Sequence, residues 1–101
     1  MEIQLFESQG NGRAFVRGDK GTLAEMTWIP GGEDHIVIDH TRVDESLRGT
    51  GTGKKLLDAI VTVASQRGLK IKPVCPFVVA MFRKYSEYGG ISLPEGSGQS
   101  G

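Results

Sequence analysis

The chain has 101 residues, a common size for one domain, and its single cysteine cannot form an intrachain disulfide. Twelve basic and twelve acidic side chains balance, and neither sign forms a block typical of a nucleic-acid or membrane-binding surface. There is no signal-peptide pattern and no apolar stretch near the ~20 residues of a membrane span. We therefore expect one cytoplasmic domain over residues 1–94 and a flexible Gly/Ser tail over residues 95–101.

The first part of the sequence predicts four extended segments in a meander, at residues 3–7, 13–17, 22–29 and 35–43. Asn11-Gly12 can adopt positive φ at little cost, so we expect it to close the first hairpin. In the fourth segment, strict alternation places Ile36, Ile38 and His40 on one face and residues 37, 39, 41 and 43 on the other. Apolar residues on both faces indicate a central strand.

The second part predicts a helix, a strand and a second helix. Apolar residues recur at helical spacing from Leu56 to Ala64, and Arg67-Gly68 is a helix-ending pair. Residues 69–74 resume extended structure, and a strand–helix–strand order favours a parallel pair. Pro73 lacks the N–H of a paired strand, so this strand should part from a neighbour there. Pro76 suits the first position of a second helix. The expected fold is α/β, with a mixed, mostly antiparallel sheet of about five strands and two helices.

A glycine-rich stretch at residues 47–53 precedes the first helix, an arrangement that can hold a phosphate. A P-loop would need glycine at position 48 and serine or threonine at 55, where the chain has Arg48 and Lys55. A dinucleotide fingerprint would need glycine at 54 or 56, where the chain has Lys54 and Leu56. Both nucleotide motifs are excluded, and a flexible loop before a helix remains the alternative.

The pattern Arg48-x-x-Gly51-x-Gly53, directly after a strand and at the start of a helix, resembles the acyl-CoA signature of the GNAT N-acetyltransferase superfamily. Together with residues 40–43 and 70–77, residues 47–57 are similar to its very small, single-domain subfamily. The order and spacing agree over most of residues 14–88. The resemblance implies a GNAT fold, acetyl-CoA as co-substrate and no metal.

In GNAT proteins the loop amides hold the CoA pyrophosphate, and the pantetheine arm pairs with a strand edge exposed where the fourth and fifth strands separate. The resemblance places that edge near Val43 in this chain. It also implies that Lys54 and Lys55 add charge at the rim, although ordinary solvated lysines are an equal alternative. The residues implied for the pyrophosphate are Arg48, Gly49, Thr50, Gly51, Thr52 and Gly53.

Three residues are candidates for catalysis. Cys75 precedes Pro76 and would be the N-cap of the last helix, where the dipole favours a thiolate able to accept an acyl group. His40 is the histidine within the signature and a candidate general base. Tyr85 lies where many GNAT enzymes place a tyrosine that protonates the CoA thiolate. The alternatives are a small buried cysteine, a histidine that pairs across strands, and an aromatic residue at the core edge.

We therefore expect an N-acetyltransferase that acts on an amine of a protein, peptide or small molecule, directly or through Cys75. The alternative is a CoA-binding or protein-interaction module without turnover. Neither nucleic acid nor a membrane is expected as a partner, and the expected state is a monomer or weak dimer. The sequence does not identify the acceptor.

Overall fold

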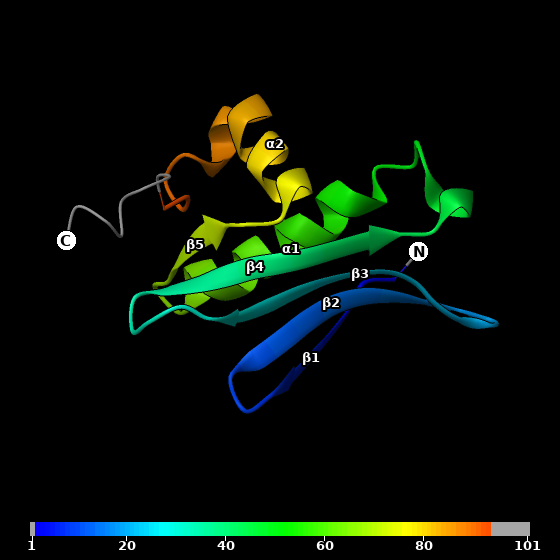
Figure 1. Ribbon diagram of the computed structural model, residues 1–101, viewed down its shortest axis with the longest axis horizontal. Helices are drawn as coiled ribbons and strands as arrows, with labels where there is room; N and C mark the ends of the chain where they lie inside the picture. The colour runs from blue at the N-terminus through cyan, green and yellow to red at the C-terminus, as the bar shows by residue number, and fades with distance from the viewer. Residues whose placement is uncertain (1, 94–101) are drawn as a thin grey trace.

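The computed structural model describes residues 2–93, so the tail expected at residues 95–101 lies outside the described part. The chain forms one mixed sheet with the strand order β1-β2-β3-β4-β5 (Figure 1). Neighbours are antiparallel except β4 and β5, which are parallel, as predicted. The strands are β1 (Gln4–Ser8), β2 (Asn11–Gly18), β3 (Gly21–Pro30), β4 (His35–Val43) and β5 (Lys70–Pro73). The helices are α1 (Thr52–Gln66), α2 (Pro76–Lys84) and the short 3₁₀ turns η1 (Glu45–Leu47) and η2 (Ser86–Tyr88).

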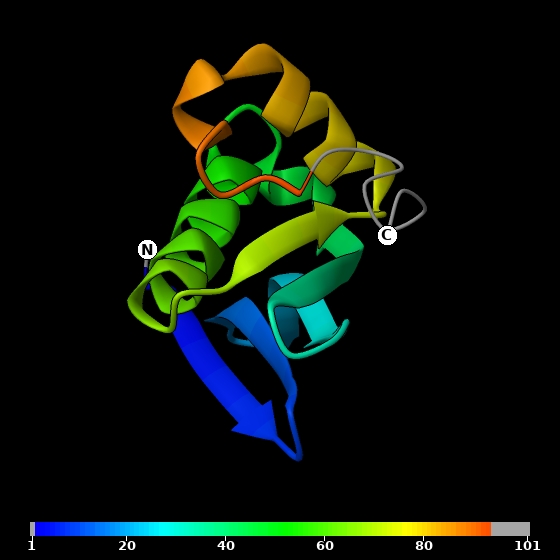
Figure 2. The same ribbon diagram turned by 90° about the vertical axis from the view of Figure 1, so that its left-hand side faces the viewer.

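Helix α1 packs its apolar stripe on one face of the sheet. It contacts β2, β3, β4 and β5, while α2 contacts β5 and η2. No helix of residues 2–93 covers the opposite face, which we call the open face (Figure 2). Among the described residues, no helix is long and apolar enough to cross a membrane. The fully buried core includes Met26, Trp28, Ile38, Leu56, Leu57, Ile60, Ile71 and Val78.

The first hairpin turns two residues earlier than predicted. Positive φ occurs at Gln9 (57°) and Gly10 (87°), while Asn11 and Gly12 already belong to β2. The prediction of an Asn11-Gly12 turn is therefore wrong. Gly12 is needed for packing, because an added Cβ there would lie 2.1 Å from the ring of Trp28. The glycine signals a close approach of a side chain rather than a turn.

Strand β4 contains a β-bulge that the alternation did not reveal. Ile38 pairs with Trp28 and His40 pairs with Thr27, so Asp39 is an extra residue. Beyond it, Thr41 pairs with the buried Met26. Thr41 and Val43 consequently lie on the helix side with Ile36 and Ile38, and His40 lies on the open face. The predicted face of His40 is wrong because one extra residue reverses the alternation.

Strands β4 and β5 separate after Ile38. Their register ends at the pair Ile38 and Pro73, and the backbone N–H groups of Val74 and Cys75 both donate to the Ile38 carbonyl at 3.2 Å. Residues 39–43 extend past the last pair with β5. A separation near Pro73 was predicted and is confirmed.

The cause of the separation differs from the predicted one. The Ile71 N–H donates to the Ile91 carbonyl, and the Leu93 N–H donates to the Ile71 carbonyl. Both backbone groups of Ile71 therefore point away from β4. In a parallel strand the backbone groups of every second residue point to the same neighbouring strand. The backbone nitrogen of Pro73, two residues after Ile71, therefore also points away from β4. Its missing N–H therefore removes nothing from the β4–β5 ladder. The strands part because the chain turns into α2 at Cys75 while β4 bulges at Asp39.

Candidate active site

A pocket of about 350 Å³ lies between the glycine-rich loop, the end of β4 and α2. Its lining residues are far apart in the sequence, and they include most of those predicted to bind acyl-CoA. Thr50 is outside the lining and instead donates through Oγ1 to the Leu47 carbonyl. The lining residues are Val43, Leu47, Arg48, Gly49, Gly51, Thr52, Gly53, Lys54, Phe77, Met81 and Tyr85.

At two of its glycines the loop borders open space beside this pocket. Gly49 (φ 77°) and Gly51 (φ 78°) are left-handed, a conformation that glycine adopts without strain. A Cβ built at either position meets no described atom within 4 Å, so both glycines border open space. Gly51 is the N-cap of α1, and the Lys55 N–H donates to its carbonyl at 3.1 Å. The helix start thus offers N–H groups and a positive dipole end, which suit a phosphate.

Gly53 serves a different purpose from Gly49 and Gly51. A Cβ at position 53 would lie 2.4 Å from the Phe77 ring, so this glycine lets α2 approach α1. Phe77 is 37% exposed and lines the pocket, although it was not singled out from the sequence. Its spacing of four and eight residues from Met81 and Tyr85 is the signal that could have placed it there.

Lys54 connects α1 to the segment after α2. Its Nζ lies 3.2 Å from Asp58 and 3.4 Å from Glu87, and 4.9 Å from the centre of the Tyr85 ring. The Tyr88 hydroxyl, and after it the Asp58 carboxylate, hold the pKa of Lys54 above its usual range. Two carboxylates therefore already face the positive charge. A rim role towards CoA stays a prediction for Lys54.

Tyr88 anchors the same connection. Its side chain is 2% exposed, and its hydroxyl donates to Asp58 at 2.6 Å. Burial, followed by the bond to Asp58, raises the pKa of Tyr88 to about 12, while the nearby Lys54 opposes the rise. The Tyr88 ring also contacts those of Phe82 (5.1 Å between centroids) and Tyr85 (6.2 Å). These contacts hold the wall of the pocket that contains Tyr85.

Cys75 lies at the point where β4 and β5 part. It is the N-cap of α2, as predicted, and its residue is 7% exposed. The thiol donates to Thr41 Oγ1, with 3.2 Å between sulfur and oxygen. Thr41 was missed from the sequence, because without the bulge at Asp39 it was placed on the other face from Ile38.

The three predicted catalytic residues do not meet at one point. Tyr85 caps the C-terminal end of α2 and lines the pocket with the glycine-rich loop. Cys75 lies outside the lining, at the head of the β4–β5 separation. His40 is exposed on the open face opposite Thr27. The structure therefore joins Tyr85 with the loop, Cys75 with Thr41, and leaves His40 on the other side of the sheet.

The comparison with protein families finds a match to the GCN5-related N-acetyl-transferase model over residues 13–91. The chain belongs to this GNAT family. The family confirms the resemblance seen in the sequence and makes this protein an N-acetyltransferase by membership, in a family that uses acetyl-CoA. The comparison with curated proteins found no match.

Solved structures agree with the GNAT assignment. A GCN5-like protein from Staphylococcus aureus shares 34% identity, covering 91% of this chain and 87% of that one, with a TM-score of 0.73. A ribosomal-protein-alanine N-acetyltransferase from Brucella melitensis biovar Abortus 2308 shares 22% identity over 87% and 67%, with a TM-score of 0.60. An aminoglycoside acetyltransferase from an uncultured soil metagenomic sample shares 15% over 76% and 57%, with a TM-score of 0.61. The last two show likeness of fold alone.

Proposed function

We propose that this GNAT protein transfers the acetyl group of acetyl-CoA to an amine and binds the CoA pyrophosphate at residues 48–53. One observation carries the proposal: a single pocket contains the open backbone at Gly49 and Gly51, the end of β4 at Val43, and Tyr85. The glycines leave room for a ligand where the helix N-terminus is positive. The residues present therefore fit a pyrophosphate.

The end of β4 is proposed to hold the pantetheine arm. Residues 39–43 lie beyond the last pair with β5, so an extended, amide-containing chain can add to this edge as a strand would. Acetyl-CoA supplies the activated acetyl thioester. A backbone N–H near Val43 stabilises the negative charge that develops on the thioester oxygen. Tyr85, or water, gives a proton to the departing thiolate.

Cys75 offers a second route for the same transfer. Its sulfur bonds to the acetyl carbon while the bond from that carbon to the CoA sulfur breaks, and the thiol proton passes to the CoA thiolate. An amine then attacks the Cys75 thioester, releasing the cysteine sulfur, which regains a proton from the amine. The hydrogen bond from the thiol to Thr41 holds Sγ in place for the first step. His40, from the open face, is proposed to take one proton from the incoming ammonium group, which leaves the neutral amine that attacks.

Mass spectrometry after incubation with acetyl-CoA and an amine-bearing peptide tests the proposal. Acetylated peptide supports transfer, and acetylated Cys75 that disappears when the peptide is added supports the covalent route. The Cys75→Ala variant is the matched control: if it still acetylates the peptide, transfer is direct. If calorimetry detects no CoA binding by the unmodified protein, the proposal fails.

A CoA-binding module without turnover is the second candidate. The uncovered open face favours it, because no helix of residues 2–93 encloses an acceptor there. Tight CoA binding with neither acetylated peptide nor acetylated Cys75 would establish this alternative.

A further inference from the structure

A row of side chains crosses the open face and ends where β4 and β5 separate. Phe6 pairs with Arg13, Arg13 pairs with Thr27, and Thr27 pairs with His40, so these four lie side by side on β1, β2, β3 and β4. With strands about 4.8 Å apart, the row spans about 14 Å. His40 follows Ile38, the last residue paired with β5, by two positions. A molecule lying along the row therefore reaches the β4–β5 separation from the open face.

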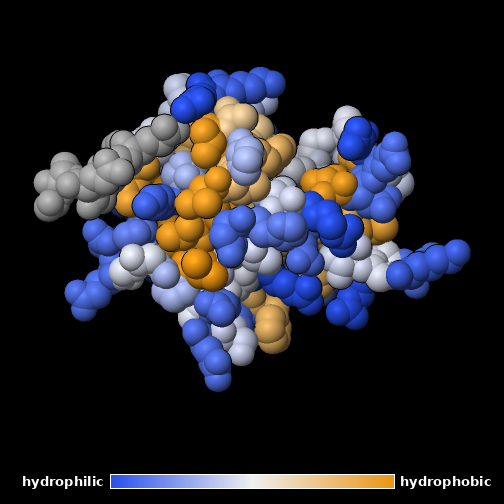
Figure 3. Space-filling model, viewed as in Figure 1, coloured by the Kyte–Doolittle hydropathy of each residue, from blue (hydrophilic) through white to orange (hydrophobic). Residues whose placement is uncertain are grey.

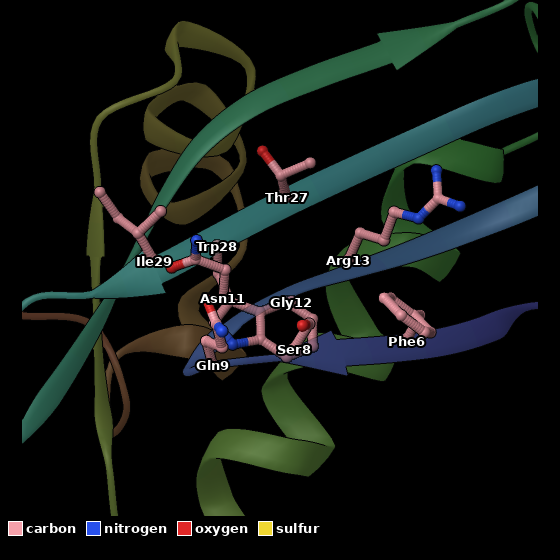
Figure 4. A pocket seen from close by; sticks show the side chains of 9 residues that line it. All are labelled: Phe6, Ser8, Gln9, Asn11, Gly12, Arg13, Thr27, Trp28 and Ile29. Atoms are coloured by element: carbon pink, nitrogen blue, oxygen red, sulfur yellow. The ribbon is translucent and has the colours of Figure 1, made fainter.

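The far end of the row is hollowed. A pocket of about 480 Å³ lies there, and Figure 4 shows that its lining comes from β1, β2 and β3. Its lining includes Phe6, Ser8, Arg13, Thr27 and Ile29. Phe6 is 57% exposed and Ile29 is 39% exposed, so apolar surface lies beside hydroxyl groups and a guanidinium group. This mixture suits a short stretch of peptide.

The open face also carries an excess of positive charge. The guanidinium groups of Arg13 and Arg17 lie 4.3 Å and 5.9 Å from the centre of the Phe15 ring. Arg42, exposed, is paired with Glu25 in the sheet and donates to the Thr22 carbonyl at 2.9 Å. Figure 3, coloured by hydropathy, shows hydrophilic residues at the centre of the view beside a hydrophobic area to their left.

The carboxylates named on this face, Glu25 and Asp39, are fewer than its cations. Glu25 lies 3.6 Å from Arg13, and Asp39 accepts a bond from the Thr27 hydroxyl at 2.6 Å. Lys72, exposed and paired with Val37 on the same face, adds another cation. Because the whole chain has a formal net charge of zero, the positive excess is local to the open face.

We infer that the acceptor is a lysine within an acidic peptide segment, and that this segment lies along the row from Phe6 to His40. The inference rests on the proposed acetyl transfer and names its substrate. Carboxylates on either side of the lysine face Arg13 and Arg42, an apolar residue contacts Phe6, and the amine enters the β4–β5 separation beside His40. Charge complementarity of this kind raises the rate of encounter and excludes basic segments.

Three N-terminally acetylated peptides with one central lysine test the inference, flanked by glutamate, glutamine or arginine. We expect kcat/KM for acetylation to be at least about 10-fold higher with glutamate than with arginine flanks, and the ratio to fall as salt rises. Arg13→Gln and Arg42→Gln should each lower the activity on the glutamate peptide by about 2–5-fold. Arg83→Gln, which removes the same charge from α2, is the matched control and should leave the preference unchanged.

Binding without turnover separates this inference from the proposed function. A glutamate peptide that carries a fluorescent label should therefore bind the protein in the absence of acetyl-CoA, with a rise in its fluorescence anisotropy. Selective binding of that peptide without acetylation would support the surface and contradict the transfer. Equal acetylation of all three peptides, or a preference for arginine flanks, would overturn the inference and leave the transfer intact.

Discussion

The two halves of β4 differ in what they do, although they belong to one strand. Residues 36–38 pair with β3 on one side and β5 on the other, and Ile36 and Ile38 are buried in the core. Residues 40–43 pair with β3 and run past the end of β5. Val43 lines the pocket, and Thr41 accepts the hydrogen bond of Cys75. The first half holds the fold together, and the second half has a free edge for a ligand.

The difference arises from one extra residue and one helix start. The bulge at Asp39 moves Thr41 and Val43 to the helix side, and Cys75 turns the chain from β5 into α2. Because β5 stops pairing early, the rest of β4 keeps backbone N–H and C=O groups that a full-length neighbour would have hydrogen-bonded. A small domain can therefore form a binding edge without an additional element.

Replacing a side chain in the paired half should have the largest effect on stability. Ile38→Ala removes a fully buried side chain, and we expect the free energy of unfolding to fall by about 2–5 kcal/mol. Val43→Ala, at a half-buried position beside the pocket, should cost only about 1 kcal/mol but weaken CoA binding more than Ile38→Ala does. Urea unfolding and calorimetry measure the two effects. Equal stability losses would show that the halves are not distinct.

Tyr88→Phe tests how much the hydrogen bond from Tyr88 to Asp58 contributes to stability. The variant leaves the Asp58 carboxylate without its 2.6 Å donor, and we expect a loss of about 1–2 kcal/mol in unfolding free energy. The pKa of Tyr88 rises from its ordinary 10.0 to about 12 on folding, so the folded protein holds this proton more tightly. Its contribution is complete below pH about 10 and is lost as the pH rises to about 12.

The pH dependence of unfolding distinguishes this role from simple packing. In the Tyr88→Phe variant the fall in stability between pH about 10 and about 12 should be smaller than in the parent. Identical profiles for the two proteins would show that the Tyr88 hydroxyl does not contribute through its proton.

Pro73→Val should have the smallest effect. Because Pro73 faces away from β4, restoring its N–H adds no bond between β4 and β5. We expect stability and CoA binding free energy to stay within about 0.5 kcal/mol of the parent. A large loss of CoA binding would show that the missing N–H does keep the strands apart, and would restore the explanation drawn from the sequence.

Regular patterns in the sequence predicted the sheet, α1, the N-cap at Cys75 and the family. Periodicity and capping patterns depend on residues that are close in sequence. They predict the structure correctly where no contact with a distant segment opposes them. The turn at Gln9-Gly10 was missed because the ring of Trp28, distant in sequence, requires a glycine at position 12. The bulge at Asp39 has no local signature, so the positions of His40 and Thr41 could not be predicted.

The most direct test of the glycine-rich loop is a CoA titration of two matched variants by calorimetry. Gly51 (φ 78°) and Gly68 (φ 69°) are both left-handed, and a Cβ at either meets no described atom within 4 Å. Valine at either position should therefore cost at least about 1 kcal/mol of stability through the backbone. We predict that Gly51→Val weakens CoA binding by more than about 10-fold, or 1.4 kcal/mol, while Gly68→Val leaves it unchanged. Equal CoA affinity in the two variants would contradict the assignment of the pyrophosphate to residues 48–53.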